Sequence, residues 1–384
     1  MSGPSPQVAS MLDAIQTNGA TFQDTGNDVS RAKLLQAARS LVHELEPPFE
    51  VLAKLNWQLP FIWSIVRVGL DIDLFSAMVA DSGSPKKVKH LAEVTGCDPP
   101  LLSRFLKHLN TADFVRETGS DEFEPTPITR AMATRSAAGM TKNVYDFANA
   151  VNHIFPDYLR ESGYKNPTDK DATAFKKAIG TDLHYFEWIA QPGMEDKLDD
   201  FKAHMEYKTL GKNWFQSVDV QQIFGNPTDP EAVLLIDIGG SFGHDLIDFH
   251  SAFPDMPGKL DFPKGIDAQA HDAFTPQPVV GAKAYYLHMV LHDWPDESCR
   301  KMLSQLVPAM QKGHSKILLN EIVVPDVGAQ WFSTSVDMLM LMCHSAQERT
   351  EGMWRDLLES VGLRISKIWD CEGNPEKIIE VELA

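Results

Sequence analysis

Cysteine is scarce in this chain of 384 residues. The four cysteines are scattered, and no two of them form a Cys-x-x-Cys pair. A disulfide framework and a cysteine-based zinc site are therefore excluded, and the thiol content fits a reducing compartment.

Basic residues are in the minority as well. Lys and Arg total 35 against 53 Asp and Glu, which gives a formal net charge of −18. Such an acidic surface repels phosphate backbones, so we expect no nucleic acid partner.

Long apolar runs and an N-terminal basic region are also missing. No segment approaches the ~18 uninterrupted apolar residues of a membrane span. The first Lys or Arg is Arg31, which leaves no charged region of a signal peptide and no Arg-rich transit peptide. We therefore expect a cytoplasmic protein that does not associate with a membrane.

What the chain does have is an apolar fraction of 43%, enough for a sizeable core, and a length that suggests two domains. Residues 1–30 are rich in small polar residues and predict a flexible tail, with one or two helical turns over 8–15. Residues 31–135 predict a mainly helical domain in which three helices precede a hairpin, the order of a winged helix. The predicted helices cover 70–80, 86–95 and 98–110, and the strands cover 114–117 and 123–126.

A winged helix suggests DNA binding, and its third helix carries Arg104, Lys107 and His108. No basic cluster surrounds the hairpin, however, and the net charge is −18. We interpret the domain as a dimerisation module. The apolar residues that we assign to a homodimer interface, because they exceed the needs of one short domain, are Ile62, Val66, Leu70, Leu74 and Phe75.

The rest of the chain, residues 136–384, predicts a second domain. Residues 136–225 are helical and rich in aromatic side chains, of which a few could line a pocket for a flat apolar ligand. From residue 226 onward, strand-like runs alternate with helices, which predicts a parallel α/β sheet. The last two strands are separated only by 370–377, too short for a parallel crossover, so the final strand should run antiparallel. The predicted strands are 233–238, 284–287, 316–322, 363–369 and 378–383.

The first motif with chemical meaning follows the first of these strands. The strand ends in Asp237, and Gly239, Gly240 and Gly243 follow before a helix begins. Glycines allow the backbone to approach a ligand closely, and a loop at this place in an α/β sheet is a common binding site. Ser241 interrupts the spacing of a dinucleotide-binding loop.

The second motif is Leu291-His-Asp-Trp-Pro-Asp-Glu, which we expect to form a helix carrying His292 and Asp293. Histidine is the side chain that takes up a proton near neutral pH, so His292 is a candidate base. The alternative, in which His292 only holds the helix through Asp293, stays open. Glu321 and Glu348 should lie at strand ends or in adjoining loops, where either could orient the imidazole.

With these motifs in place, the chain resembles the plant-type O-methyltransferase family, in its fungal secondary-metabolism branch. The likeness runs from about residue 35 to the end. Besides the His292 motif, it is carried by Asp237-Ile-Gly-Gly, Asn320-Glu-Ile-Val-Val-Pro and Glu348-Arg-Thr-Glu. The resemblance implies a Rossmann-like class I methyltransferase sheet with an N-terminal winged-helix dimerisation domain. It also implies S-adenosylmethionine as cofactor, a homodimer, and a phenolic or enolic acceptor of aromatic or polyketide-like type.

The resemblance also implies roles for single residues. His292 would remove the phenolic proton, and Glu321 and Glu348 would flank it. Asp272 would lie near the adenine of the cofactor. The residues that would line the methionine and ribose side are Asp237, Gly239, Gly240 and Gly243.

Three departures from the family concern the cofactor site. Segment 257–272 is too short to hold two parallel strands with a crossover, so the acid that grips the ribose is in doubt. Asp261 is our candidate replacement. Ser241 replaces a usual glycine, and His288, which we assign to the cofactor site, stands where relatives have Lys or Arg.

These departures predict weak cofactor binding and keep a second function open. That alternative is a member of the fold that no longer methylates and acts as a dehydratase or pericyclase, or is inactive. A third reading, a dimeric regulator that binds DNA, conflicts with the charge balance.

Overall fold

The computed structural model describes residues 6–206, 213–225, 232–241, 243–254, 256, 269–371 and 375–384. The chain divides into two units, Met1–Asn149 with Ile189–Lys208, and Ala150–Trp188 with Thr209–Ala384. The predicted boundary at residues 135 and 136 lies at the start of α9 (Arg135–Glu161), whereas the two units divide within this helix, after Asn149. Residues 189–208 join the first unit because α12 (Glu195–Met205) packs on α9, where a Cβ on Gly139 would lie 2.6 Å from the Cβ of Ala203.

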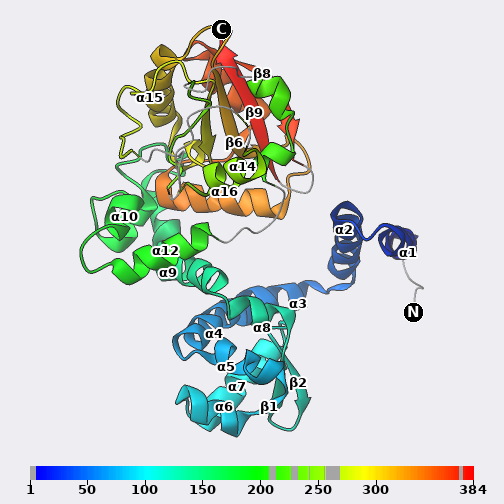
Figure 1. Cartoon of the computed structure of the whole chain (residues 1–384). Coiled ribbons are helices and arrows are strands. Elements are labelled where there is room, and N and C mark those ends of the chain that lie inside the picture. The colour runs from blue at the N-terminus through cyan, green and yellow to red at the C-terminus, as the bar shows by residue number, and fades with distance from the viewer. Residues whose placement is uncertain are drawn as a thin grey trace. The chain divides into compact units, whose positions relative to one another are not determined.

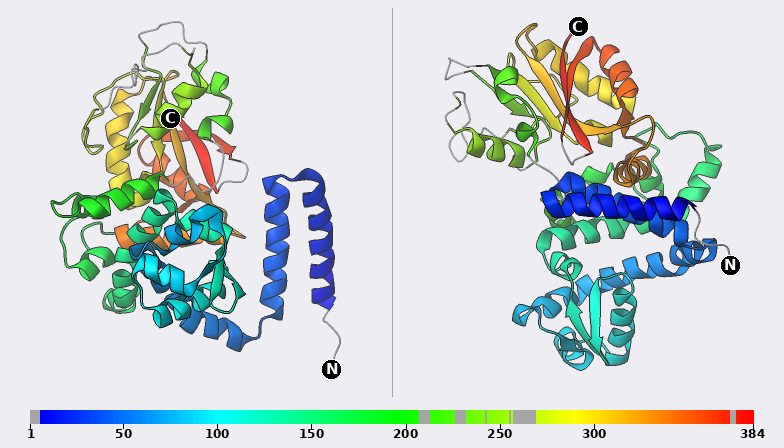
Figure 2. Two further views of the ribbon diagram at one scale, coloured as in Figure 1. Left: turned by 60° about the horizontal axis from the view of Figure 1, so that its bottom comes forward. Right: turned by 90° about the vertical axis from the view of Figure 1, so that its right-hand side faces the viewer.

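The first unit contains the predicted winged helix, whose hairpin is drawn in green-blue in Figure 2. Helix α6 ends at Gly96, which adopts a left-handed φ of 70°, and Pro99 begins α7, as the sequence predicts. The helix predicted over 70–80 is divided between the end of α4 and α5, because Asp73 takes a left-handed φ of 54° between them. The elements are α4 (Leu59–Asp71), α5 (Leu74–Val79), η2 (Asp81–Gly83), β1 (Lys86–Lys87), α6 (Val88–Thr95), α7 (Pro99–Asn110), β2 (Val115–Gly119), β3 (Glu122–Pro125) and α8 (Pro127–Met132).

The predicted flexible tail is wrong, because residues 6–25 form a helix. Helix α1 (Pro6–Thr25) is followed by α2 (Asp28–Leu45), which Asn27 caps by accepting the backbone N–H of Ser30. The two helices lie side by side, drawn in dark blue in Figure 2. The partly buried positions of α1 recur every three or four residues and include Val8, Met11, Ile15 and Phe22, but the many small polar residues between them mask the period.

The residues predicted to form a dimer interface lie instead in the core of their own winged helix. Ile62, Val66, Leu70, Leu74 and Phe75 are each no more than 8% exposed. The exposed apolar side chains belong to a neighbouring segment formed by α3 (Pro48–Ala53), the π-helix η1 (Lys54–Gln58) and the start of α4. We call residues 49–61 the apolar segment, and its exposed members are Phe49, Val51, Leu52, Leu55, Trp57, Leu59 and Phe61.

The second unit is built on a mixed sheet with the order β4-β5-β6-β9-β8, of which Figure 1 labels β6, β9 and β8. The short strand β7 pairs with the end of β6. The pairs β4–β5, β5–β6 and β6–β7 are parallel, whereas β9 is antiparallel to both β6 and β8, as predicted. The short strand β7 was not predicted. The strands are β4 (Leu235–Asp237), β5 (Ala284–His288), β6 (Lys316–Val324), β7 (Arg349–Thr350), β8 (Leu363–Asp370) and β9 (Glu376–Leu383).

Helices cover both faces of this sheet, which makes it a layered α/β fold. On one face, Tyr285, Leu287 and Leu319 pack against α15 (Asp296–Leu306) and α17 (Glu351–Glu359). On the other, Tyr286 and Leu318 pack against an aromatic cluster that includes α14 (His244–Ala252). The remaining elements are α10 (Ala174–Ile179), α11 (Tyr185–Ile189), η3 (Trp214–Gln216), α13 (Val220–Phe224), η4 (Leu291–Asp293), η5 (Val307–Ala309) and α16 (Trp331–His344).

Two further expectations concern the cysteines and membrane spans. All four cysteines are free thiols. Among the described residues, no helix combines the length and the apolar character that crossing a membrane requires.

Candidate active site

His292 lies on a tight turn where the sheet ends, and not on a helix as predicted. After β5 the chain forms the 3-10 turn η4, and α15 starts only at Asp296 because Pro295 separates the two elements. The turn follows the carboxyl end of a parallel strand, where open α/β sheets bind ligands. His292 is only 7% exposed there.

Glu321 holds this turn from the neighbouring strand. It lies within β6, whose residues from Ile317 to Val323 are all buried, and an acid in such a run is unusual. Its Oε1 accepts the backbone N–H groups of Val290 at 3.1 Å and Leu291 at 2.8 Å. Its other oxygen, Oε2, is buried and has no hydrogen-bond partner.

Glu348 fixes the orientation of the imidazole. Glu348 precedes β7 and lies 2.8 Å, through Oε1, from Nδ1 of His292. Because a carboxylate only accepts, Nδ1 carries a proton, and Nε2 is the nitrogen that can accept one from a ligand when the ring is neutral. The Oε2 atom of Glu348 is buried without a partner. Its backbone N–H donates to Oδ1 of Asp337 at 2.8 Å, which secures the residue itself.

The electrostatics of this cluster favour a protonated imidazole. Burial alone lowers the pKa of His292, but the charges of Asp293, Glu348 and Glu321 outweigh it and raise the pKa to about 10. Burial raises the pKa of Glu321 to about 7, against the opposing charge of His292. Burial likewise raises the pKa of Asp293 to about 6, and its Oδ1 lies 3.6 Å from Nε2 of His292.

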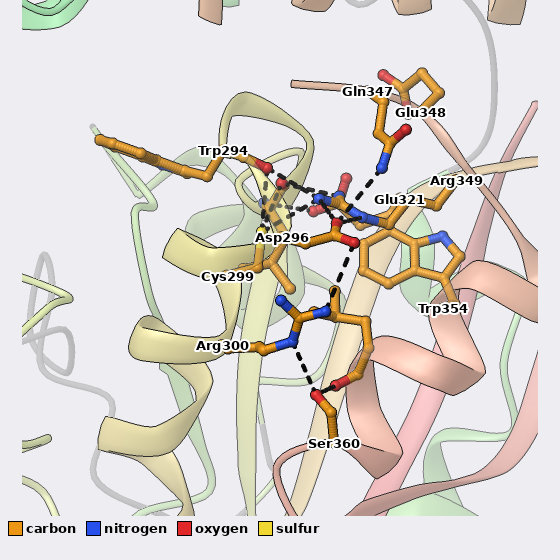
Figure 3. Close-up of polar contacts among 12 residues, drawn as sticks. Trp294, Asp296, Cys299, Arg300, Glu321, Gln347, Glu348, Arg349, Trp354 and Ser360 are labelled. Carbon is orange, nitrogen blue, oxygen red and sulfur yellow. Dashed lines mark hydrogen bonds and ion pairs between the residues drawn. The ribbon is translucent and has the colours of Figure 1, made fainter. Parts of the chain in front are cut away.

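Arg349 also holds the His292 turn, through hydrogen bonds to its backbone carbonyls, and the sequence did not predict this role. Figure 3 shows its guanidinium between the turn and Trp354. Arg349 is fully buried and donates to the carbonyl oxygens of Leu291 at 3.1 Å and Trp294 at 2.9 Å, on either side of His292. Its Nε and Nη2 both reach Oδ1 of Asp296, at 3.0 and 2.9 Å. The signal was present, because this arginine follows Glu348 directly in a motif already singled out.

Two further histidines lie beside the turn and were also missed. His344, at the end of α16, pairs its Nδ1 with Nε2 of His184 at 3.1 Å, and its own Nε2 lies 3.7 Å from Oδ1 of Asp293. The ring of His184 stacks on Trp294 with centroids 4.6 Å apart. Burial lowers the pKa of His184 to about 4, so this pair is neutral and contrasts with the cationic His292.

The glycine loop follows β4, the strand that pairs with β5. Asp237 ends β4, and a Cβ on Gly240 would overlap its carboxylate, while one on Gly239 would lie 2.9 Å from Val290. Gly243 begins α14 with a φ of 72°. Both carboxylate oxygens of Asp237 are buried without a partner, and burial with the nearby charge of Asp245 raises its pKa to about 7. An unpartnered acid beside a close backbone loop fits the cationic, methionine end of the predicted cofactor.

The other residues that the sequence assigns to the cofactor do not form one cluster with Asp237 and the glycines. Nδ1 of His288 lies 2.6 Å from Asp245, and Nε2 lies 3.1 Å from Glu376, so both ring nitrogens already have protein partners. Asp272 lies in an exposed turn and accepts the backbone N–H of Phe274 at 3.0 Å. Asp261 and most of the shortened segment 257–272 lie outside the described residues.

A buried His–Glu pair and a glycine loop at adjacent carboxyl ends of a Rossmann-like sheet define a class of group-transfer enzymes, and comparison with known proteins identifies it. Residues 168–364 match the family described as O-methyltransferase domain. The chain is 33% identical to methyltransferase cfoC of Aspergillus candidus over 98% of both chains. It is also 33% identical to demethylsterigmatocystin 6-O-methyltransferase of Aspergillus parasiticus, covering 90% of this chain and 92% of that one.

A solved structure agrees with the sequence comparisons. LepI in complex with S-adenosylmethionine superposes with a TM-score of 0.88 at 28% identity, over 98% of this chain and all of that one. The chain belongs to the S-adenosylmethionine-dependent O-methyltransferase family and is an enzyme that transfers a methyl group from this cofactor.

The contacts of Arg349 generate a prediction. Arg349→Lys keeps the charge but cannot form the planar fork, so the two carbonyls beside His292 lose their shared partner. We expect kcat to fall about 10²-fold, the usual effect of misplacing a reacting group by about 1 Å. The dissociation constant of the cofactor should stay unchanged, because Asp237 and the glycine loop make none of these contacts.

Arg355→Lys is the matched control, because Arg355 forms an exposed ion pair with Glu351 on the next helix. It should keep full turnover. Steady-state kinetics and cofactor titration decide the matter, and an Arg349→Lys enzyme with normal kcat would contradict the assignment.

Proposed function

We propose that this enzyme methylates a phenolic or enolic hydroxyl of an aromatic or polyketide-like small molecule, with His292 as the base. The observation that carries the proposal is the hydrogen bond from Nδ1 of His292 to Glu348, because it leaves Nε2 as the ring nitrogen that can accept a proton. The name of the demethylsterigmatocystin relative supports an acceptor of this chemical class and a place in secondary metabolism.

The base works by moving one proton. When Nε2 takes the proton of the acceptor hydroxyl, a poor nucleophile becomes a phenolate, and the positive charge on His292 is stabilised by Glu348 and Asp293. Bound S-adenosylmethionine supplies an already activated methyl group. The task of the protein is then to hold the acceptor oxygen in line with that methyl group, and Glu321 keeps the His292 turn in register with the sheet for this purpose.

The glycine loop would hold the cofactor. Asp237 offers its two unpartnered oxygens to the ammonium group of the methionine part, and Gly239, Gly240 and Gly243 leave room for close approach. We retain Asp261 and Asp272 as candidates for the ribose and adenine. His288 would act indirectly, by holding Asp245 and Glu376 in place.

The non-methylating alternative is disfavoured by the same geometry. A solved structure titled a pericyclic reaction enzyme also superposes with a TM-score of 0.88, so the fold alone does not discriminate between the two functions. The oriented His292–Glu348 pair and the partnerless Asp237 favour methyl transfer, because each provides a component that this reaction needs.

The test of the base is substitution. We expect His292→Ala to lower turnover by roughly 10² to 10⁴, the usual contribution of a placed base, while the dissociation constant of S-adenosylmethionine stays within about twofold. Transfer of a labelled methyl group to a phenolic acceptor measures the first quantity, and calorimetry the second. Full turnover in the variant would contradict the proposal. If the residue only holds the turn, the variant should instead lose thermal stability and keep its turnover.

The raised pKa of His292 gives a second prediction. Below a pKa of about 10 the neutral, proton-accepting form falls about tenfold per pH unit, so kcat/KM for the acceptor should rise from pH 7 toward pH 9. Glu348→Gln removes one of the charges that raises this pKa, so the rising limb should move to lower pH. Glu351→Gln, on the exposed start of α17, should leave the limb in place. A pH profile that is identical in the wild type and in Glu348→Gln would refute the assignment.

We also propose that the enzyme is a cytoplasmic homodimer, with the apolar segment as its interface. In this segment Trp57 is 61% exposed and Phe49 is 69% exposed. Soluble monomers rarely expose so many large apolar side chains next to one another. The occupant that we assign to it is a second copy of this chain.

Light scattering at micromolar concentration should therefore report a dimer. The double variant Leu55→Glu/Trp57→Glu should be monomeric, because burying two carboxylates in an apolar interface is unfavourable. Val327→Glu, at a side chain 90% exposed outside the segment, should remain dimeric. A monomeric wild type, or a dimeric double variant, would overturn the proposal.

A further inference from the structure

The His292 cluster has the composition of a metal site as well as that of a base. His292, Glu321 and Glu348 each offer one ligand atom, and these three atoms lie within 4.8 Å of one another. All three residues are buried. A cluster of acids alone would not indicate a cation, but here one oxygen of each glutamate is buried with no hydrogen-bond partner. Buried carboxylate oxygens without a partner are costly, and a proton or a cation relieves that cost.

We infer that these three residues bind a divalent transition-metal ion of the zinc type, and that this ion inhibits the enzyme. The inference rests on the proposed function, because inhibition follows only if Nε2 of His292 is the atom that takes the acceptor proton. Because Glu348 lies on Nδ1, an ion held by both residues replaces the Nδ1 proton. The neutral ring then carries its proton on Nε2, which can no longer take one from the acceptor.

The charges around the cluster favour a cation. Glu321, Glu348 and Asp293 surround one imidazole. The nearby guanidinium of Arg349 directs its donors away from them, to Asp296 and to two backbone carbonyls. The described groups at this point therefore carry more negative than positive charge when ionised, and a divalent ion restores the balance.

The donor set selects among metals. One imidazole nitrogen with two carboxylate oxygens suits zinc or cobalt better than magnesium, which prefers oxygen ligands alone. Zinc bonds of about 2.0–2.2 Å bring tetrahedral ligands to roughly 3.4 Å of one another, so modest side-chain rotations would close the site. Three protein ligands leave the fourth position open to water.

Binding of the ion should depend on pH and should have a distinct effect on catalysis. The ligands must lose their protons to bind metal, so affinity should increase with pH. The ion should disable the base without occupying the place of the acceptor. It should not compete with S-adenosylmethionine, whose predicted site is Asp237 and the glycine loop.

Direct metal binding to the full-length enzyme tests the inference, after treatment with a chelator and without cofactor or acceptor. We expect titration calorimetry to show one high-affinity zinc ion per chain, with at least tenfold tighter binding at pH 8 than at pH 6. Cobalt should give the visible absorption bands of a four-coordinate ion that zinc then displaces. Millimolar magnesium should displace neither ion.

Variants assign the site. His292→Ala and Glu348→Gln should each weaken zinc binding at least tenfold, and Glu321→Gln is a third, conservative variant in case one of the others unfolds. His314→Ala, which removes an exposed imidazole, is the matched control and should bind zinc as the wild type does. Zinc should lower kcat and leave KM for the acceptor unchanged.

Equal zinc affinity in the wild type and in all three site variants would overturn the inference, as would activation by zinc. The outcomes for the two proposals are separable. An enzyme that methylates but binds no zinc refutes this inference alone. An enzyme that binds zinc but transfers no methyl group refutes the proposed function.

Discussion

The hydrogen bond between Glu348 and Nδ1 of His292 is the interaction on which the rest of the site depends. It keeps a proton on Nδ1, leaves the second nitrogen as the one that can exchange a proton with a ligand, and supplies part of the negative charge that raises the pKa of the ring. Both partners are buried, so this bond acts in a medium of low dielectric where charge interactions are strong.

Hydrogen bonds from neighbouring elements stabilise these buried charges and the turn that carries His292. One carboxylate oxygen of Glu321 accepts two backbone N–H groups that the His292 turn would otherwise leave unsatisfied. On the other side, Arg349 satisfies the carbonyls that flank the turn and the carboxylate of Asp296. The base is thus held by strands β6 and β7 together, and its position does not depend on the flexibility of a loop.

Sequence predicted those parts of the fold whose cause is local. The winged helix followed from caps and breakers such as Gly96 and Pro99, and the antiparallel last strand followed from the short link after β8. The motifs correctly placed Asp237 and His292 at strand ends and Glu348 in a loop, whereas Glu321 lies within β6, just beyond the point where its neighbour β5 ends.

What the sequence could not supply arises from contacts between distant segments. Strand β7 has only two residues and forms because β6 offers it an edge, and Arg349 has no recognisable role until the turn lies next to it. Likewise, the small polar residues that dominate the first 30 positions hid α1, whose helical period is carried by a few half-buried apolar residues such as Val8, Met11 and Phe22. The apolar residues assigned to the dimer were buried in their own domain, because a count of apolar side chains does not reveal what each one packs against.

The most direct measurement of the central claim is the titration of the His292 imidazole in the free enzyme. Selective isotope labelling of histidine, with His292→Ala to assign the resonance, reports its protonation by NMR. Because three carboxylates surround the ring, the account predicts that His292 stays protonated well above the ordinary histidine pKa of about 6.5, through pH 9. A pKa at or below about 6.5 would show that burial outweighs those charges, and would contradict the account.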